Sequence, residues 1–369
     1  MAHHSPVAVS ILTGFLGAGK TTLLNRLLKD PALADTAVII NEYGEVSIDH
    51  LLVEQASDGV IQLSDGCLCC TVRGELVDTL ADLIDRMQTG RIAPLKRIVV
   101  ETTGLADPVP VLQAVMGHPA LAQALRLDGV VCVVDAVNGP STLDAHEEAV
   151  RQVAVADRIV VAKADLAGTD AVAALAARLR RLNPSAPILD AADGATGAAA
   201  LFDCGLYDPA TKTADVRRWL GEAHDHDHDH HDHDHGEDGH HHHRHDRRVT
   251  AVSLVHDRPV PFSTIEAFLD LLRATQGEKL LRMKGVIELA EDPERPLAIH
   301  GVQKLMHPPA QLPRWPDGGR GTRIVLIAFD LPEDYVRRLF SAFMGEPAVD
   351  APDRAALSQN PLAIAGFRG

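Results

Sequence analysis

The chain has 369 residues, of which 46% are hydrophobic and 23% are charged, a composition typical of a soluble globular protein and not of a disordered one. The formal net charge of −16 argues against a nucleic-acid or membrane partner, because both attract a basic face. No apolar run approaches the roughly 18 residues of a membrane-spanning helix, and from the composition of residues 1–6 we expect no secretion signal. With only five cysteines, we expect no disulfide scaffold and a cytoplasmic, reducing setting.

Strand-like and helical patterns alternate through the first half of the chain. Apolar runs typical of buried strands lie at residues 7–12, 37–40, 60–63, 98–100, 130–134, 159–161 and 188–189. Apolar stripes typical of helices lie at 21–28, 72–87, 142–156 and 171–182. This alternation predicts an α/β domain with a mostly parallel sheet wrapped by helices on both faces.

A polar tract over residues 224–248 interrupts this pattern. It contains no aliphatic residue, so it cannot contribute to a core and is expected to be a flexible linker. Strand patterns return at 249–255, 286–289 and 324–329, with helical patterns at 264–272 and 335–343. We therefore predict a first domain over residues 1–222, a His/Asp-rich linker over 223–248 and a smaller α+β domain over 249–369.

The segment from Gly14 to Thr21 reads GFLGAGKT and matches the phosphate-loop pattern G-x-x-x-x-G-K-[ST] in full, between a strand and a helix. Its glycines let backbone N–H groups turn toward an anion, and the helix N-terminus adds partial positive charge. Lys20 is expected to bridge the outer phosphates, and the Thr21 hydroxyl is expected to bind Mg²⁺. The predicted phosphate-binding residues are Gly14, Gly17, Ala18, Gly19, Lys20, Thr21 and Thr22.

A second acidic position follows the strand at 98–100. Glu101 can hold Mg²⁺ through water or orient the attacking water, and the Gly104 N–H can sense the γ-phosphate. Lys20 and Glu101 are thus the predicted catalytic residues.

The strand at 159–161 leads into Ala162-Lys163-Ala164-Asp165, which is close to the Asn-Lys-x-Asp loop that reads guanine in many nucleotide-binding proteins. Asp165 can accept hydrogen bonds from the N1–N2 edge of guanine, and the stem of Lys163 can lie over the ring. Ala162 lacks the side-chain amide of the first position. We favour GTP as the nucleotide, and a phosphotransferase or ATPase that uses ATP is the alternative.

Three thiols lie within four positions in Gly66-Cys67-Leu68-Cys69-Cys70. Cys67, Cys69 and Cys70 can supply thiolates to Zn²⁺, Cu(I) or Co²⁺, and a three-ligand site leaves one position open for transfer of the ion. A redox pair and cysteines without a shared role are the alternatives. Cys132, inside an apolar run, is expected to be a buried small residue.

Two further segments can bind metal or sense the nucleotide. The segment 41–49, NEYGEVSID, can sense the γ-phosphate, bind Mg²⁺ or complete the thiolate site. The polar tract holds 12 of the 20 histidines, and neutral imidazoles bind zinc-like ions. We expect metal capture there, with a solvated linker as the alternative; the accessory ligands predicted are His224, His226, His228, His230, His231, His233 and His235.

Together these motifs resemble those of the CobW-type GTPases, the zinc-chaperone and cobalamin-synthesis branch of the metal-handling P-loop GTPases. The resemblance spans nearly the whole chain. It rests on GFLGAGKTT (14–22), NEYGEVSID (41–49), GCLCC (66–70), ETTGLADP (101–108), ADRIVVAKADL (156–166), RMKGV (282–286) and TRIVLI (322–327). Ala162 departs from the asparagine usual in the family, which bears on guanine selectivity and not on the fold.

The resemblance implies a P-loop GTPase domain followed by a CobW-like C-terminal domain. It implies a zinc metallochaperone that hydrolyses GTP to hand its metal to a client metalloprotein, with GTP, Mg²⁺ and Zn²⁺ or Co²⁺ bound, acting as a monomer or homodimer. Delivery of cobalt in cobalamin synthesis is equally compatible. The resemblance also brings Glu45 toward the thiolate metal.

The expected mechanism couples the two sites. Bound Mg-GTP orders the segment 41–49 and the cysteine loop, and hydrolysis relaxes them so that metal affinity falls. A rival of another class is a metal buffer or sensor in which the nucleotide is only structural.

Overall fold

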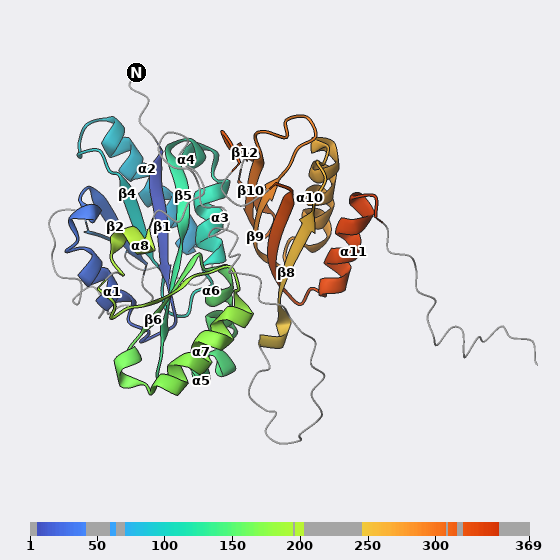
Figure 1. The fold of residues 1–369 in the computed structure, drawn as a ribbon. Helices are drawn as coiled ribbons and strands as arrows, with labels where there is room; N and C mark the ends of the chain where they lie inside the picture. The colour runs from blue at the N-terminus through green and yellow to red at the C-terminus, as the bar shows by residue number, and fades with distance from the viewer. Residues whose placement is uncertain are drawn as a thin grey trace, which may run out of the picture.

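The computed structural model describes residues 6–41, 60–63, 71–194, 196–202, 246–307, 309–315 and 320–346. Two domains follow one another along the chain (Figure 1). Among the described residues, no helix combines the length and apolar character that a membrane crossing requires.

The N-terminal domain is built on a seven-stranded sheet in the order β3-β2-β4-β1-β5-β6-β7. Every pair in it is parallel, so the predicted parallel α/β architecture is confirmed. The strands are β1 (Val7–Thr13), β2 (Thr36–Asn41), β3 (Val60–Leu63), β4 (Arg97–Glu101), β5 (Leu125–Asp135), β6 (Arg158–Ala162) and β7 (Ile188–Asp190). Strand β1 lies at the centre and is buried along its whole length, as its apolar sequence requires.

Helices cover both faces of this sheet. They are α1 (Lys20–Leu27), α2 (Thr71–Gln88), α3 (Val109–Gly117), α4 (Pro119–Ala124), α5 (Gly139–Ala145), α6 (Glu147–Val155), α7 (Thr169–Leu182) and α8 (Ala198–Leu201), with 3₁₀ turns η1 (Pro31–Leu33), η4 (Ala164–Leu166) and η5 (Asp246–Arg248). Helices α1 and α8 pack on one face, where Leu24 and Leu201 meet Val99 and Val133. Helices α2, α3, α6 and α7 pack on the opposite face.

The single helix predicted over 142–156 is wrong, because the chain forms α5 and α6 with a break at His146. That residue is extended, with φ −130° and ψ 115°. Its ring stacks on Phe15 of the phosphate loop, with 4.4 Å between ring centroids. The break thus directs a ring onto the phosphate loop, a tertiary contact that the helical apolar pattern does not reveal.

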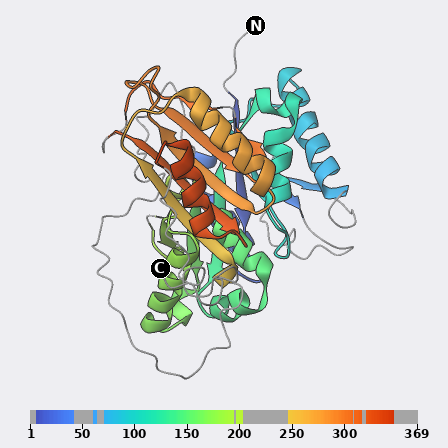
Figure 2. The same ribbon diagram turned by 90° about the vertical axis from the view of Figure 1, so that its right-hand side faces the viewer.

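The C-terminal domain has an antiparallel sheet in the order β11-β10-β9-β13-β8, with β12 also paired to β10. Its elements are β8 (Val249–His256), α10 (Phe262–Gln276), β9 (Leu280–Ile287), β10 (Leu297–Val302), β11 (Leu305–Met306), β12 (Ala310–Gln311), β13 (Thr322–Phe329) and α11 (Glu333–Phe343). Figure 2 shows α10 and α11 on the outer face of this sheet, where Phe268 and Phe340 fill the core. The predicted α+β domain is confirmed.

The inner face of the same sheet packs on the N-terminal domain. Val302, Ile327 and Phe329 share one apolar cluster with Leu112 and Val115 of α3. The strand expected at 286–289 begins six residues earlier, at Leu280. Arg282 and Lys284 interrupt the apolar run that would indicate this strand. Both side chains are nevertheless buried, because they form ion pairs with Asp157 across the domain boundary.

Candidate functional site

The phosphate loop connects the end of β1 to the start of α1. Gly14, Gly17 and Gly19 have φ values of 140°, 72° and 103°, a region that favours glycine. At Gly14 a Cβ would also lie 2.3 Å from the carbonyl oxygen of Val133 on β5. The glycines therefore allow both the turn of the loop and its close approach to the sheet.

Lys20 folds back over this loop. Its Nζ donates to the carbonyl oxygens of Gly14, at 2.9 Å, and Phe15, at 3.4 Å. The residue is 7% exposed. An ammonium held over an anion-binding loop is placed to meet phosphate oxygens, the task predicted for it.

Thr21 and Glu101 come together next to the loop. The Thr21 hydroxyl donates to Glu101 Oε1 at 3.1 Å, and both residues are buried. Leu12 of β1 pairs with Glu101 at the end of β4, which explains why these distant residues meet. Hydroxyl and carboxylate oxygens are the hard ligands that Mg²⁺ prefers, so the chemistry of the pair fits this ion, and Mg²⁺ binding here stays a prediction.

The loop after β4 touches the phosphate loop at Gly104. A Cβ there would lie 2.5 Å from the backbone nitrogen of Leu16. Gln152, fully buried on α6, donates from Nε2 to the carbonyl oxygens of Gly104 and Ala106, at 3.1 and 3.0 Å. Sequence patterns did not single out Gln152, because it looks like one polar residue of an amphipathic helix.

The loop after β6, which the sequence predicts to read the base, contacts the phosphate loop through Lys163. This residue has a left-handed backbone, with φ 57°. Its Nζ donates to Gly17 O at 2.8 Å and to Asp135 Oδ2 at 2.7 Å. Asp165 is exposed beside it, in the short turn η4, and Ala162 is buried at the end of β6. Asp135 is a further residue of the site that the sequence analysis did not mark.

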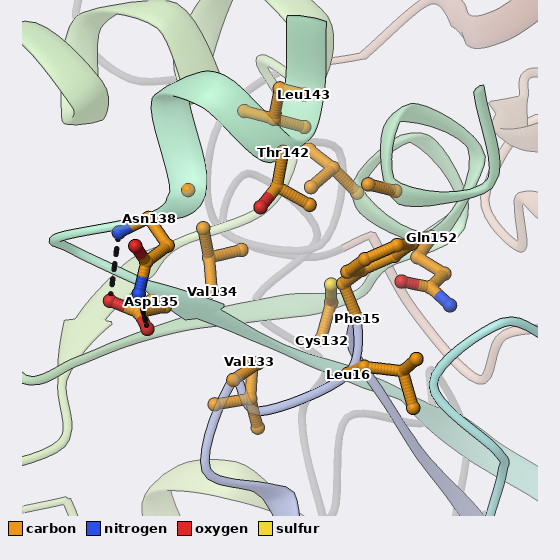
Figure 3. Close-up of a pocket in the computed structure, with 14 residues that line it drawn as sticks. Phe15, Leu16, Cys132, Val133, Val134, Asp135, Asn138, Thr142, Leu143 and Gln152 are labelled. Carbon is orange, nitrogen blue, oxygen red and sulfur yellow. Dashed lines mark hydrogen bonds between the residues drawn. The ribbon is translucent and has the colours of Figure 1, made fainter. Parts of the chain in front are cut away.

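A small hollow lies under the phosphate loop, between β5, α5 and α6. Figure 3 shows Phe15 and Leu16 of the loop beside Cys132 and Gln152. Burial raises the pKa of the Cys132 thiol to about 12, and the residue is 1% exposed. Cys132 is the buried small residue that its apolar run predicted.

The remaining predicted ligands lie outside the described residues. They are Glu45, Cys67, Cys69, Cys70 and the accessory histidines His224, His226, His228, His230, His231, His233 and His235. Within the part of the chain that the structure describes, no three His, Cys, Asp or Glu side chains converge as a metal site. The thiolate site therefore stays a prediction.

In this site a buried lysine folds over a glycine loop, and a hydroxyl–carboxylate pair lies beside it, with the carboxylate on the adjacent parallel strand. The P-loop nucleoside triphosphatases have this arrangement, and the chain is of that class. Residues 8–190 match the family model of the CobW/HypB/UreG nucleotide-binding domain, and residues 249–344 match that of the cobalamin synthesis protein cobW C-terminal domain. The chain belongs to the CobW family.

Curated relatives match over nearly the full length. The zinc chaperone YjiA of Escherichia coli (strain K12) is 34% identical over 340 residues, which cover 91% of this chain and 98% of YjiA. The zinc chaperone CobW of Sinorhizobium sp is 28% identical, covering 93% of this chain and 99% of that protein. The crystal structure of Zn(II)-bound YjiA GTPase from E. coli has a TM-score of 0.66 at 31% identity, covering 92% of this chain and 99% of that chain. The chain is accordingly a P-loop GTPase of this family.

Proposed function

We propose that this chain is a metallochaperone GTPase that binds Zn²⁺ as cargo and transfers it to a client metalloprotein. Cys67, Cys69 and Cys70 would bind the ion, with Glu45 as a further ligand. The similarity of the chain to two zinc chaperones supports this proposal most directly. One observation carries the proposal: the phosphate loop contacts the loop after β4 at the carboxyl ends of the parallel strands, and β3 ends on this same side of the sheet.

The register of the sheet supports a short separation between thiols and phosphates. Leu63, the last residue of β3, pairs with Asn41 of β2, and Ile40 next to it pairs with Glu101. Strand β3 lies three strand spacings from β1 in the sheet, which is about 14 Å at the usual distance between neighbouring strands. Residues 64–70, which contain the motif, join this end of β3 to Thr71 at the start of α2. The thiols would therefore lie near the nucleotide.

The residues of the site divide the work of hydrolysis. Lys20 and the backbone N–H groups of the loop would bind the phosphates and hold the charge that develops on them. Thr21 and Glu101 would bind Mg²⁺, which supplies further neutralisation of phosphate charge when it is present. Gly104, already against Leu16, would donate its N–H to the γ-phosphate. Loss of that phosphate would remove a contact that only the triphosphate state provides.

The coupling to metal follows from linkage. If the GTP-bound state orders the segment 41–49 and the cysteine loop, the thiolate site binds its ion more tightly with GTP than with GDP. Bound metal must then tighten GTP binding by the same factor. Hydrolysis would lower metal affinity and favour transfer to the client.

We further propose a location, a reserve of ions and an assembly state for the protein. A cytoplasmic location would keep the thiols reduced. The histidine tract would hold exchangeable ions near the first domain, and the protein would act as a monomer or homodimer. Cobalt is the other cargo compatible with thiolate ligands.

The test measures Zn²⁺ and Co²⁺ affinity by competition with a chromophoric chelator. The protein is examined with Mg-GTP analogue, with Mg-GDP and without nucleotide, as wild type and as C67S/C69S/C70S. Cys204→Ser is the matched control. We expect the tightest binding with the GTP analogue, lost in the triple variant and kept in the control. Equal affinity in all three nucleotide states would rule out GTP-driven transfer and favour a metal buffer, and tighter Co²⁺ binding would change the cargo.

A further inference from the structure

We propose that Asp135 is a positioning residue for base recognition, which fixes Lys163 against the phosphate loop in a chain whose base-reading loop begins with Ala162. The inference rests on the proposed function in taking the base to be guanine. Asp135 would act through Lys163 and would not touch the nucleotide itself.

The contact geometry supports this role. Lys163 Nζ bridges two acceptors on different loops, Asp135 Oδ2 at 2.7 Å and Gly17 O at 2.8 Å. The side chain of Asp135 is 8% exposed and that of Lys163 is 37% exposed. Left-handed backbone is rare for lysine because of its Cβ, so the loop conformation at φ 57° depends on contacts that compensate for its cost.

Asp135 is itself held rigidly at the end of β5. Its Oδ1 accepts from the backbone N–H groups of Val137, at 2.7 Å, and Asn138, at 3.1 Å. Its Oδ2 accepts from Asn138 Nδ2 at 3.0 Å, and Figure 3 shows Asn138 turned toward the carboxylate. The next residue, Ala136, donates its N–H to Ala162 O at 2.8 Å. The carboxylate is therefore fixed by contacts from the protein itself.

The charge state of Asp135 suits the task. Burial by itself raises the pKa of this carboxyl, but the hydrogen bonds from Lys163, Asn138 and Val137 outweigh burial and hold the pKa below its ordinary value of 3.8. The residue is thus ionised at neutral pH, and its bond to the ammonium is charge-assisted at both ends.

Fixing the ammonium has a consequence for the base. With Nζ held between Asp135 and Gly17, the aliphatic stem of Lys163 is left as an apolar surface beside the exposed Asp165. A planar base that stacks on this stem would present its edge to the Asp165 carboxylate. Because Asp135 already holds the Lys163 side chain in one position, nucleotide binding costs less side-chain entropy. Asp135 would therefore raise nucleotide affinity without a contact of its own.

The test is a double-mutant cycle on the full chain with Asp135→Asn, Lys163→Met and the double variant. Asparagine keeps an oxygen for the turn at Val137 and removes the charge that holds Lys163. Asp190→Asn is the matched control, because Asp190 also ends a strand and accepts from the backbone of its own turn, at 2.8 Å from Ala192 N, with no lysine partner among the described residues. Affinity for fluorescent GDP, its ADP counterpart and inorganic tripolyphosphate is measured for each.

We expect Asp135→Asn to weaken GDP binding about tenfold, because Lys163 is then no longer fixed against the phosphate loop and binding must order it, while tripolyphosphate affinity is unchanged. The double variant should bind GDP no more weakly than Lys163→Met alone, because Asp135 acts through Lys163. Additive effects in the cycle, or a Asp135→Asn variant that behaves as Asp190→Asn, would overturn the inference.

Failure of the proposed function gives a different result. If the wild-type chain binds ADP as tightly as GDP, the guanine assignment is wrong. The cycle is then evaluated on ADP, where coupling between Asp135 and Lys163 supports the positioning role and additivity contradicts it.

Discussion

Asp157 of the N-terminal domain and Arg282 of the C-terminal domain form an ion pair that is almost completely buried at the boundary between the domains. Arg282 Nη2 donates to both carboxylate oxygens, at 3.0 and 2.9 Å. Asp157 is 2% exposed and Arg282 7% by side chain. Lys284 contacts the same carboxylate, and Val130 N donates to it at 2.9 Å. A charge network inside the interface therefore joins the two domains.

Asp157→Asn should destabilise the protein by about 3–5 kcal/mol, because it leaves two buried cations without their counter-charge. Chemical denaturation of the full chain measures the loss. Asp82→Asn is the matched control, since Asp82 pairs with Arg86 on the exposed face of α2 and should change the free energy of unfolding by at most about 0.5 kcal/mol. Equal effects of the two substitutions would contradict the importance of the buried network.

The same pair predicts a loss of stability in acid. Burial alone raises the pKa of Asp157, but Arg282 and Lys284 outweigh it and hold the pKa below the ordinary value of 3.8. A carboxyl with a lowered folded-state pKa contributes stability above its unfolded-state pKa, and that stability is lost as the pH falls through the folded-state value. The wild type should lose stability below about pH 4. Denaturation measured from neutral pH down to about pH 2 should show a shallower loss of stability for Asp157→Asn than for the wild type, and parallel curves would refute the assignment.

Gly104→Ala should slow GTP hydrolysis by about 10- to 100-fold, because the added methyl meets the Leu16 backbone and displaces the loop from the phosphate loop. Steady-state turnover measures kcat, and fluorescent nucleotide titration measures binding, which should change less. Gly168→Ala is the control, since a Cβ there meets nothing within 4 Å and φ is −70°. Normal turnover in Gly104→Ala would show that the contact with Leu16 is dispensable.

Glu101→Gln should lower kcat by about 100-fold and shift its dependence on Mg²⁺ to higher concentration, because a neutral amide holds the cation less well than a carboxylate. Turnover at graded Mg²⁺ concentrations measures both effects. Glu278→Gln removes an exposed carboxylate paired with Lys304 and should leave the Mg²⁺ dependence unchanged. A Glu101→Gln variant with wild-type Mg²⁺ dependence would assign Glu101 to the attacking water and not to the ion.

Cys132 should resist alkylation in the native protein at pH 8, since burial raises its thiol pKa to about 12 and encloses the sulfur. Peptide mapping by mass spectrometry after iodoacetamide treatment gives the modified fraction at each cysteine. Denatured protein, in which all five cysteines should react, is the control. Rapid modification of Cys132 in the folded chain would contradict its enclosed position.

Local sequence patterns predict most of the strands and the phosphate loop of the N-terminal domain. The strand β1, the glycines of the phosphate loop and Lys20 are contiguous, so one short stretch of chain carries every signal for that part of the site. Buried parallel strands also give unbroken apolar runs, which are easy to recognise. Helices α3 and α4 were not anticipated, since α3 is apolar around most of its circumference and has no clear amphipathic period.

The amino-acid sequence was enough to predict the parallel sheet, the phosphate loop and the family, because each strand pattern and each motif is a contiguous stretch that can be recognised by itself. It did not reveal that Asp135 would hold Lys163, that Gln152 would bind the Gly104 loop or that Arg282 would be buried against Asp157. Those partners are separated by between 28 and 125 positions. Whether a charged residue faces water or a partner depends on which strands and helices become neighbours, and that is settled only when the chain is packed.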